Sequence, residues 1–332
     1  MKKTLFTGIC MAGSLLASCS SIQTLTFDQL YPAEITYPEQ VNSVAVVNNM
    51  ASIPEPKDGL LTIGLLEGDG KIAAETLAGA LADSRYFNQV LICDSVLRSD
   101  DARPTDPSML TPAQVDTLAS RLGVDMLFSV ERVLMKTSRQ EMFYPGFSMP
   151  FAMVEMKATR LVRVYLPSRA TPVAPVTKTD SLYWEISSEV SDKVLVKEGS
   201  SGAFTSLLND LVPHWGQTTR VYYDGGCVEM RDAAVCLREN DWAGARELWT
   251  KLYEDRKKGR MKMKAAFNVA LALEMEGNTD RASEWLEKAK ACESADAEDR
   301  ELMEYYTYLL NEKKKDLPKL DLQMKRFVNK IP

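Results

Sequence analysis

The chain has 332 residues, of which 45% are hydrophobic and 26% are charged, and these proportions are typical of a globular protein with room for two domains. Its net charge of −6 argues against nucleic acid as a partner, because binding phosphates needs clustered Lys and Arg. Beyond the amino terminus, no apolar run approaches the roughly 20 residues that a transmembrane helix requires.

The amino terminus has the pattern of a bacterial export signal. Lys2 and Lys3 precede an uncharged apolar segment at residues 5–16. That segment is too short to span a bilayer but has the length of a secretory signal core. We therefore expect residues 1–18 to be a signal peptide that is removed on export.

The signal ends in Leu16, Ala17, Ser18 and Cys19. An aliphatic residue, two small residues and a cysteine resemble the lipobox of bacterial lipoproteins. The resemblance implies cleavage before Cys19, diacylglycerol on its thiol and an acyl chain on its new amino group. Several acyl chains would bind the membrane stably, whereas a single chain holds only marginally. The alternative is an ordinary signal peptide with Cys19 unmodified.

Residues 19–40 contain Ser, Thr and Pro and predict a lipidated tether. Strand and helix signals then alternate. Residues 41–48 and 90–93 are β-branched runs typical of buried strands, and a helix is expected to begin at Gly70 between them. A second helix is expected from a capping box formed by Thr111 and Gln114, with Pro112 at its first position, to a terminal glycine at 123. A strand at residues 124–134 follows directly.

Two later segments alternate apolar and polar residues. Even positions from 154 to 166 are apolar except Arg160, and the alternation returns at residues 182–186. Period two predicts a half-exposed antiparallel pair. A helix starting at Ser200 or Ser201 should end before Pro213. The sequence thus predicts an α/β domain with a mixed sheet over residues 41–216.

Three short segments of this domain have counterparts elsewhere: residues 44–47 (VAVV), 84–92 (SRYFNQVLI) and 122–130 (LGVDMLFSV). They loosely resemble the α/β modules of exported bacterial lipoproteins such as the curli-secretion lipoprotein and the peptidoglycan-synthase activators. The resemblance implies a related fold and brings no catalytic residues with it.

Two stretches of the C-terminal part align at an offset of 37 residues, as between Ala245 and Ala282. Their pattern of small and large residues is similar to tetratricopeptide repeats, whose period is about 34. The resemblance covers residues 228–291 and implies a small helical solenoid that binds protein segments; the alternative is a bundle that only braces the α/β domain. We expect a tetratricopeptide-like domain over residues 217–332, with one helix broken at Pro318 and a last short helix after it.

The chain as a whole, with residues 220–223 (RVYY) and 240–245 (NDWAGA), resembles a family of Bacteroidetes lipoproteins that combine a lipobox, an α/β region and a tetratricopeptide region. The resemblance implies no particular activity. In this phylum an acidic run after the lipidated cysteine resembles a surface-export tag, and residues 20–23 (SSIQ) lack one. We therefore expect an outer-membrane anchor with the chain facing the periplasm.

The residue types that usually carry chemistry are scarce. His214 is the single histidine and is expected at a helix end or an interface rather than in a catalytic triad or zinc site. Cys93, Cys227, Cys236 and Cys292 lack metal-ligand spacing, so buried thiols or one disulfide are the options. The glycines at residues 59–70 lack the spacing of a phosphate loop. We predict no catalytic residue, no metal and no cofactor.

An aromatic loop supplies the remaining candidate site. Phe143, Tyr144, Phe147 and Phe151 form either a docking patch for a partner or plain packing under the sheet. The sequence therefore favours a membrane-anchored, non-enzymatic interaction or assembly module with a protein partner in the cell envelope. The alternative is a small-molecule or glycan binder or hydrolase that uses a cleft of the α/β domain.

Overall fold

The computed structural model describes residues 22–52, 56, 59–93, 97–98, 108–143, 150–169, 171–187, 189–293 and 295–328. The chain folds into two compact units, each made from two separate parts of the sequence. The α/β unit comprises Leu30–Gly216 with Asp316–Pro332, and the helical unit comprises Gln217–Lys315 with the residues up to Gln29.

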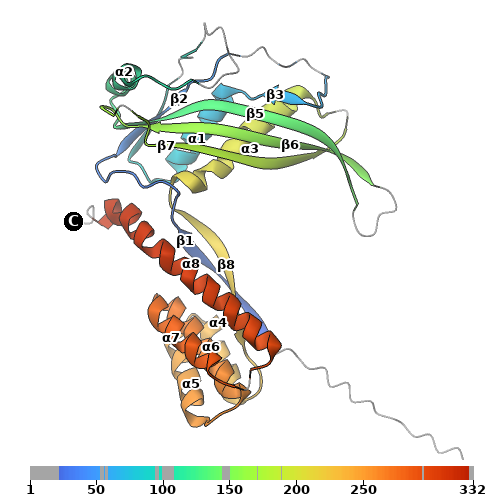
Figure 1. The fold of residues 1–332 in the computed structure, drawn as a ribbon, viewed down its shortest axis with the longest axis vertical. Coiled ribbons are helices and arrows are strands. Elements are labelled where there is room, and N and C mark those ends of the chain that lie inside the picture. The colour runs from blue at the N-terminus through green and yellow to red at the C-terminus, as the bar shows by residue number, and fades with distance from the viewer. Residues whose placement is uncertain are drawn as a thin grey trace, which may run out of the picture. The chain divides into compact units, whose positions relative to one another are not determined.

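The α/β unit is built on a six-stranded mixed sheet, as the alternating strand and helix signals predicted (Figure 1). β2 pairs in parallel with β4 and β5, whereas β5, β6 and β7 follow one another antiparallel, and the short β3 pairs with β5. The strands are β2 (Ser43–Asn48), β3 (Leu65–Glu67), β4 (Gln89–Cys93), β5 (Met126–Met142), β6 (Phe151–Tyr165) and β7 (Ala174–Glu185).

Three helices cover this sheet. α1 (Gly70–Asp83) and α3 (Asp192–Leu211) pack on one face, where they bury a large core that includes Leu77, Phe128 and Phe204. α2 (Pro112–Leu122) packs on the opposite face over Val47 and Leu127. Successive side chains of β2 and β5 therefore point alternately into two different cores, one on each face of the sheet.

The local signals around α2 are confirmed. Thr111 Oγ1 accepts a hydrogen bond from the Gln114 N–H, and the Gln114 side chain accepts one from the Thr111 N–H in return. Gly123 has φ of 67°, the left-handed conformation that ends a helix at little cost for glycine.

The start of α3 differs from its prediction. The helix begins at Asp192, not after Ser200 or Ser201, and the Asp192 carboxylate accepts hydrogen bonds from the backbone and hydroxyl of Thr62. Ser200 lies buried inside the helix, where its hydroxyl accepts the Asp69 N–H at 2.8 Å. Ser200 therefore does not cap α3 but accepts a hydrogen bond from the residue that precedes α1.

The predicted tether at residues 19–40 is folded wherever the structure describes it. β1 (Ile22–Tyr31) pairs with β8 (His214–Tyr223) in a two-stranded sheet, and neither strand was predicted. Ala33, Ile35 and Tyr37 are then buried in the α/β unit. A polar-looking segment is ordered here because its backbone finds partners that are distant in sequence.

The helical unit contains two helical hairpins with matching turns. The helices are α4 (Val228–Arg238), α5 (Trp242–Asp255), α6 (Arg260–Met275) and α7 (Thr279–Lys290), followed by α8 (Ala297–Val328). At the two turns Asn240 and Gly277 both have positive φ, 63° and 80°, and Asp241 and Asn278 both cap the next helix. The internal repeat inferred from the sequence is thus repeated in backbone geometry.

The prediction that Pro318 breaks the last helix is wrong, because α8 continues through it to Val328. A proline inside a helix costs about 3 kcal/mol. Contacts beyond it offset that cost: Gln323 hydrogen-bonds both backbone groups of Ala33, and the Arg326 guanidinium lies 4.1 Å from the Tyr86 ring centroid. Among the described residues, no helix is long and apolar enough to cross a membrane.

Candidate functional site

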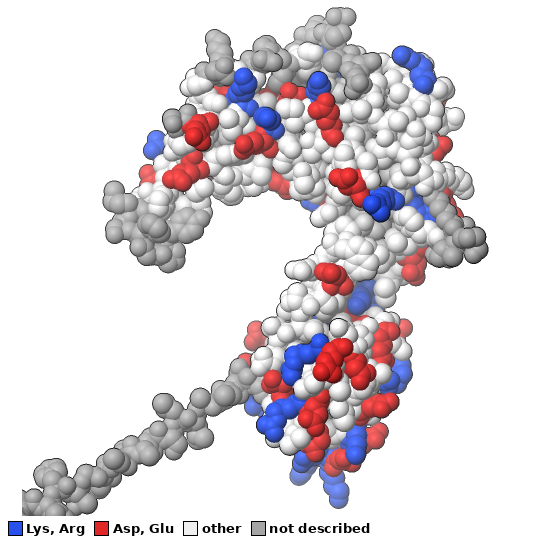
Figure 2. Space-filling view, turned by 180° about the vertical axis from the view of Figure 1, so that it is seen from behind, with Lys and Arg blue, Asp and Glu red and all other residues white. Residues whose placement is uncertain are grey.

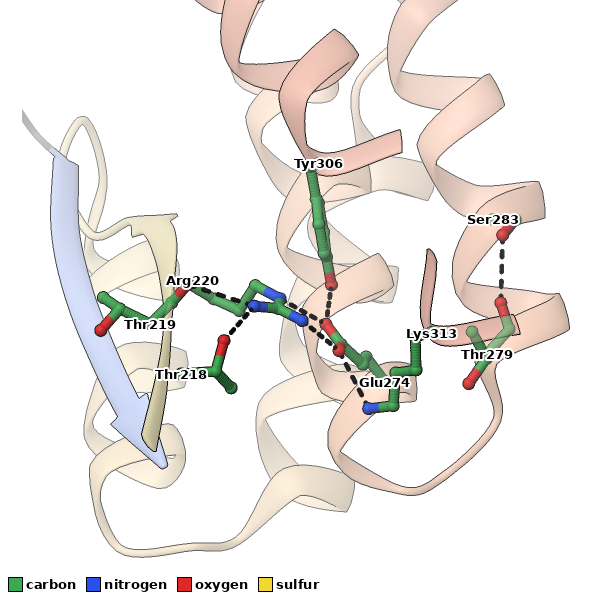
Figure 3. A network of polar contacts seen from close by, with 8 residues as sticks. All are labelled: Thr218, Thr219, Arg220, Glu274, Thr279, Ser283, Tyr306 and Lys313. Carbon is green, nitrogen blue, oxygen red and sulfur yellow. Dashed lines mark hydrogen bonds and ion pairs between the residues drawn. The ribbon is translucent and has the colours of Figure 1, made fainter. Parts of the chain in front are cut away.

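The helical unit holds a buried network of charges centred on Glu274 of α6 (Figure 3). Its carboxylate accepts two hydrogen bonds from Arg220 of β8, at 3.0 and 2.9 Å, one from the Tyr306 hydroxyl at 2.8 Å and one from Lys313 at 3.0 Å. Arg220 also donates to the Thr218 hydroxyl. Three elements, β8, α6 and α8, are therefore joined at one carboxylate.

The electrostatics of this network suit a structural role. Burial raises the pKa of Glu274, but the hydrogen bonds from Arg220 and the charge of Lys313 outweigh it and hold that pKa below its usual value. Burial, reinforced by the neighbouring Glu274 carboxylate, raises the pKa of Tyr306 well above its ordinary value. Both groups keep one protonation state at neutral pH, and neither is tuned as an acid or base for catalysis.

A second network lies where α6 and α8 begin. The Tyr223 hydroxyl donates to Asp299 at 2.7 Å, and Arg260 donates to the same carboxylate at 2.7 and 3.0 Å. Burial raises the pKa of Asp299, but hydrogen bonds from Arg260 and Tyr223 lower it below its ordinary value. This network connects the end of β8 to the first residues of two helices.

A cavity of about 320 Å³ opens beside this second network, where α5 ends, α6 begins and α7 ends. Lysine is its most frequent lining residue, with four lysines against one glutamate. The lining consists of Tyr253, Lys257, Lys258, Gly259, Lys262, Lys288, Ala291, Cys292 and Glu293. On the face that Figure 2 shows, basic and acidic side chains are mixed across the helical unit. The lining of this cavity differs from that mixed surface because its lysines outnumber its acidic residues.

Aromatic rings orient two of the cavity lysines. Lys262 Nζ lies 4.1 Å from the centroid of the Tyr253 ring, and Lys288 Nζ lies 3.9 Å from the centroid of the Trp285 ring. The two rings contact each other nearly edge to face, at 5.0 Å and 76°. Cation–π contacts of this kind hold ammonium groups in place without neutralising them.

The other two cavity lysines, Lys257 and Lys258, are not held by aromatic rings of the described residues. Lys257 and Lys258 are exposed and form no ion pair or hydrogen bond with any residue that the structure describes. Their charges therefore remain available to an anion at the cavity mouth.

The α/β unit has a different, apolar cavity of about 290 Å³ beside α2. Its lining carries no titratable side chain among the described residues: Leu97, Leu110, Ala113, Gln114, Thr117 and Leu118. Beneath it, the Tyr165 hydroxyl accepts the Leu110 N–H and donates to Glu131, whose side chain is fully buried. This geometry fits an apolar guest and offers no acid or base directed at it.

Arg160, which interrupts the apolar alternation, lies fully buried on the face of the sheet that α1 and α3 cover. Nη1 donates to Asp180 at 2.6 Å, and Asp180 also accepts from Ser206 of α3. Nε and Nη2 of Arg160 are buried and have no hydrogen-bond partner among the described residues. The sequence exception is thus a buried ion pair that ties β6, β7 and α3 together.

The predicted aromatic patch lies at the tip of the β5–β6 hairpin. Phe143 follows β5 and is 72% exposed, so it does not pack under the sheet. Phe151 opens β6 opposite Met142 and is half-buried. Tyr144 and Phe147 lie outside the described residues, as do Leu16, Ala17, Ser18 and Cys19.

His214 begins β8 instead of ending a helix, and its ring stacks on Tyr31 at 5.8 Å. The four remaining cysteines, Cys93, Cys227, Cys236 and Cys292, are free thiols, each half-buried. In the described parts of the chain no three His, Cys, Asp or Glu side chains are grouped to hold a metal ion.

The lysine-lined cavity was not predicted. Its sequence signal is the basic run at residues 256–260, which by itself is explained better by solvated helix ends than by a binding patch. Lys288 comes from another helix and reaches the cavity only through packing of α7 on α6, with the Trp285 ring against its ammonium group. Periodicity within one helix cannot reveal such a meeting.

Comparison with protein families gives two adjacent matches. The protein-family model with the description "Domain of unknown function (DUF8603)" matches residues 41–223, more than half of the chain. The chain belongs to this family. The DUF8603 match runs from the first strand of the mixed sheet through β8, and a second model, "Domain of unknown function (DUF6340)", matches residues 231–312 in the helical unit.

Several solved structures show weak likeness. A PelC dodecamer from Paraburkholderia phytofirmans is 13% identical, covers 56% of this chain and 98% of its own, and has a TM-score of 0.26. A minor lipoprotein from Acinetobacter baumannii is 9% identical, covers 53% and 97%, and has a TM-score of 0.22. With scores this low no property is transferred from them. No curated protein matches the chain.

Proposed function

We propose that this DUF8603 protein is a lipid-anchored, non-enzymatic interaction or assembly module of the bacterial cell envelope. The membrane would be bound through acyl chains on Cys19, and a protein partner through the helical unit. Outer-membrane attachment with the chain facing the periplasm follows from the signal sequence and from the absence of an acidic run at residues 20–23.

The repeated helical hairpin is the observation that carries the interaction role. Ala245 and Ala282 are fully buried at equivalent positions, and the turns before them share their backbone geometry. Stacked helical hairpins of this kind present extended surfaces that commonly bind protein segments. We therefore propose that the helical unit binds a segment of a partner protein, as the tetratricopeptide resemblance implies.

The state of the titratable groups also supports a non-enzymatic role. The most deeply buried carboxylates, those of Glu274, Asp299 and Glu131, are each engaged by two or more donors from the protein itself. A catalytic carboxylate needs a free oxygen directed at substrate. We accordingly propose no catalytic residue and no cofactor.

Acyl labelling tests the anchor. Cells are fed an alkyne-tagged fatty acid, the protein is isolated from the envelope, and its first mature peptide is measured by mass spectrometry. We expect the label on Cys19 and its loss in Cys19→Ala. An unlabelled amino-terminal peptide, or a Cys19→Ala chain that still partitions with membranes into detergent, would refute anchoring.

Crosslinking tests the partner. The native, detergent-solubilised protein should crosslink in fixed proportion to one envelope protein through the helical unit. Charge reversals on exposed positions of α5 and α7, such as Arg281→Glu, should reduce the yield, whereas Lys71→Glu in the α/β unit should not. Equal yields from all variants would count against the helical unit as the binding surface.

One observation keeps the second function in view. The apolar cavity beside α2 suits a small guest, such as a lipid chain or an apolar face of a glycan. Since the described lining has no titratable group, binding is favoured over hydrolysis. An ordered small molecule in this cavity, together with no crosslinked partner, would favour this alternative.

A further inference from the structure

The first described residue lies close to the proposed lipid anchor. Three residue steps separate Cys19 from Ile22, the first residue of β1, and a chain spans at most about 3.6 Å per residue. Ile22 is therefore within about 11 Å of an acylated Cys19. Ile22 also packs against the core of the helical unit. If Cys19 is acylated, this end of the helical unit must lie at the head-group layer of the membrane.

The paired strands show which end of the unit this is. Thr26 contacts Thr219 at 3.0 Å, and Tyr31 stacks on His214, so β1 and β8 run in opposite directions. The same register brings Ile22 opposite Tyr223, at the last residue of β8. The amino-terminal end of β1 thus lies where β8 ends.

The lysine-lined cavity opens at this same end. Tyr223 bonds Asp299, Asp299 bonds Arg260, and Gly259, the residue before Arg260, lines the cavity. Cys227, just after β8, also lies 4.0 Å from the sulfur of Met261 at the start of α6. Short contacts therefore connect the strand that follows the anchor with the cavity wall.

The chemistry of the cavity fits a membrane surface. Anionic lipid head groups attract nearby Lys and Arg, and Tyr and Trp rings are enriched where a protein meets the head-group layer. Here four lysines line the cavity, with a Tyr–Trp pair beside two of them, and Lys257 and Lys258 are exposed at its mouth. Glu293 is the opposing charge in the lining and leaves a clear positive excess.

We propose that this cavity holds the phosphate of an anionic phospholipid in the membrane to which Cys19 is anchored. The proposal rests on the proposed anchoring and adds a second, electrostatic attachment. An acyl anchor combined with a basic site holds a protein more firmly than either alone and fixes which side of it faces the bilayer.

Vesicle binding of a chain without acyl groups tests the site. The mature chain carrying Cys19→Ser is mixed with vesicles of phosphatidylcholine alone or with about one third phosphatidylglycerol, and the bound fraction is measured by sedimentation. We expect binding only to the anionic vesicles. Lys257→Gln with Lys258→Gln should weaken it about 25-fold, since each lysine near an anionic surface contributes about fivefold. Both side chains are exposed, so this variant should fold normally.

A matched variant separates this site from general charge attraction. Lys71→Gln with Lys136→Gln removes the same charge from exposed positions of the α/β unit, away from the cavity lining. It should weaken binding less than twofold. Equal losses in the two double variants, or equal binding to neutral and anionic vesicles, would overturn the proposal.

Thiol footprinting locates the bound lipid. Cys292 lines the cavity and Cys93 lies in the α/β unit, and both are half-buried free thiols. Anionic vesicles should slow alkylation of Cys292 several-fold and leave Cys93 unchanged. If millimolar inorganic phosphate alone protects Cys292 equally, the site takes a soluble anion and the membrane proposal fails. Because this chain has no acyl groups, a failure of anchoring at Cys19 would appear in the labelling experiment and not here.

Discussion

Replacing Glu274 with glutamine tests whether the buried network holds the helical unit together. The side chain is fully buried and its carboxylate accepts four hydrogen bonds. Three of them come from positively charged groups: two from Arg220 and one from Lys313. Glu274→Gln keeps the size of the side chain but removes its charge. The amide nitrogen can no longer accept, so the donors on one side of the group lose their partner.

The magnitude follows from those contacts. About two charge-assisted bonds are lost, each worth about 1.5–3 kcal/mol, and the Arg220 charge stays buried without its counter-ion. Breaking a buried ion pair by removing one partner costs about 3–5 kcal/mol. We expect Glu274→Gln to lower the free energy of unfolding of the helical unit by that amount, and its urea midpoint by about 2 M.

Urea titration followed by circular dichroism at the helix band measures the loss. Glu276→Gln is the matched control, because Glu276 lies two residues further along and pairs with Arg246 at 2.9 Å in a partly exposed position. Exposed pairs contribute about 0–1 kcal/mol. A cost below about 1 kcal/mol for Glu274→Gln, or equal costs for the two variants, would refute the reasoning.

Four further outcomes are expected. Because the pKa of Glu274 is lowered by folding, the stability it contributes is present above its unfolded value near 4.3 and lost as pH falls through the lower folded value, so the midpoints of wild type and Glu274→Gln should converge as the pH is lowered below about 4.3. Asp180→Ala should destabilise the α/β unit by about 3 kcal/mol in urea titration, since it leaves Arg160 buried and unpaired, whereas Arg160→Met should cost much less. Gly277→Ala should cost about 1–2 kcal/mol in the melting curve of the helical unit, purely from its φ of 80°, because a new Cβ meets no atom within 4 Å. Arg326→Ala should lower the melting temperature of the α/β unit, since its guanidinium donates to the backbone of Val41 and stacks on Tyr86, and an unchanged melting curve would contradict that contact's importance.

The elements that were predicted correctly are those determined by interactions between residues close together in the sequence. The capping box at Thr111, the glycine at 123 and the antiparallel alternation around Arg160 all depend on residues close together in the chain, and each is confirmed. The 37-residue offset between the two C-terminal stretches was found in the sequence, and the structure adds that both turns, at Asn240 and Gly277, combine a left-handed residue with the cap of the next helix.

The missed elements depend on partners that are distant in sequence. β1 pairs with a strand about 190 residues away, and its own pattern is too polar to predict burial. The start of α3 was placed too late because Gly199 and Ser200 look like the end of a loop, whereas both are buried inside the helix by close packing, with an added Cβ at 199 meeting the Met156 sulfur at 2.6 Å. The lysine-lined cavity was missed for the same reason as β1, since parts of α5, α6 and α7 must first meet.

Each unit combines two segments that are far apart in the sequence, and this affects how the protein can fold during synthesis. The unit that begins at Leu30 also needs Asp316–Pro332, and Gln323 hydrogen-bonds the backbone of Ala33. A chain emerging amino terminus first cannot complete its α/β unit until residues 316–332 have also been translated. A product that stops before Gln323 would therefore leave the backbone of Ala33 without its hydrogen-bond partner, and proteases should degrade it faster than a chain that includes α8.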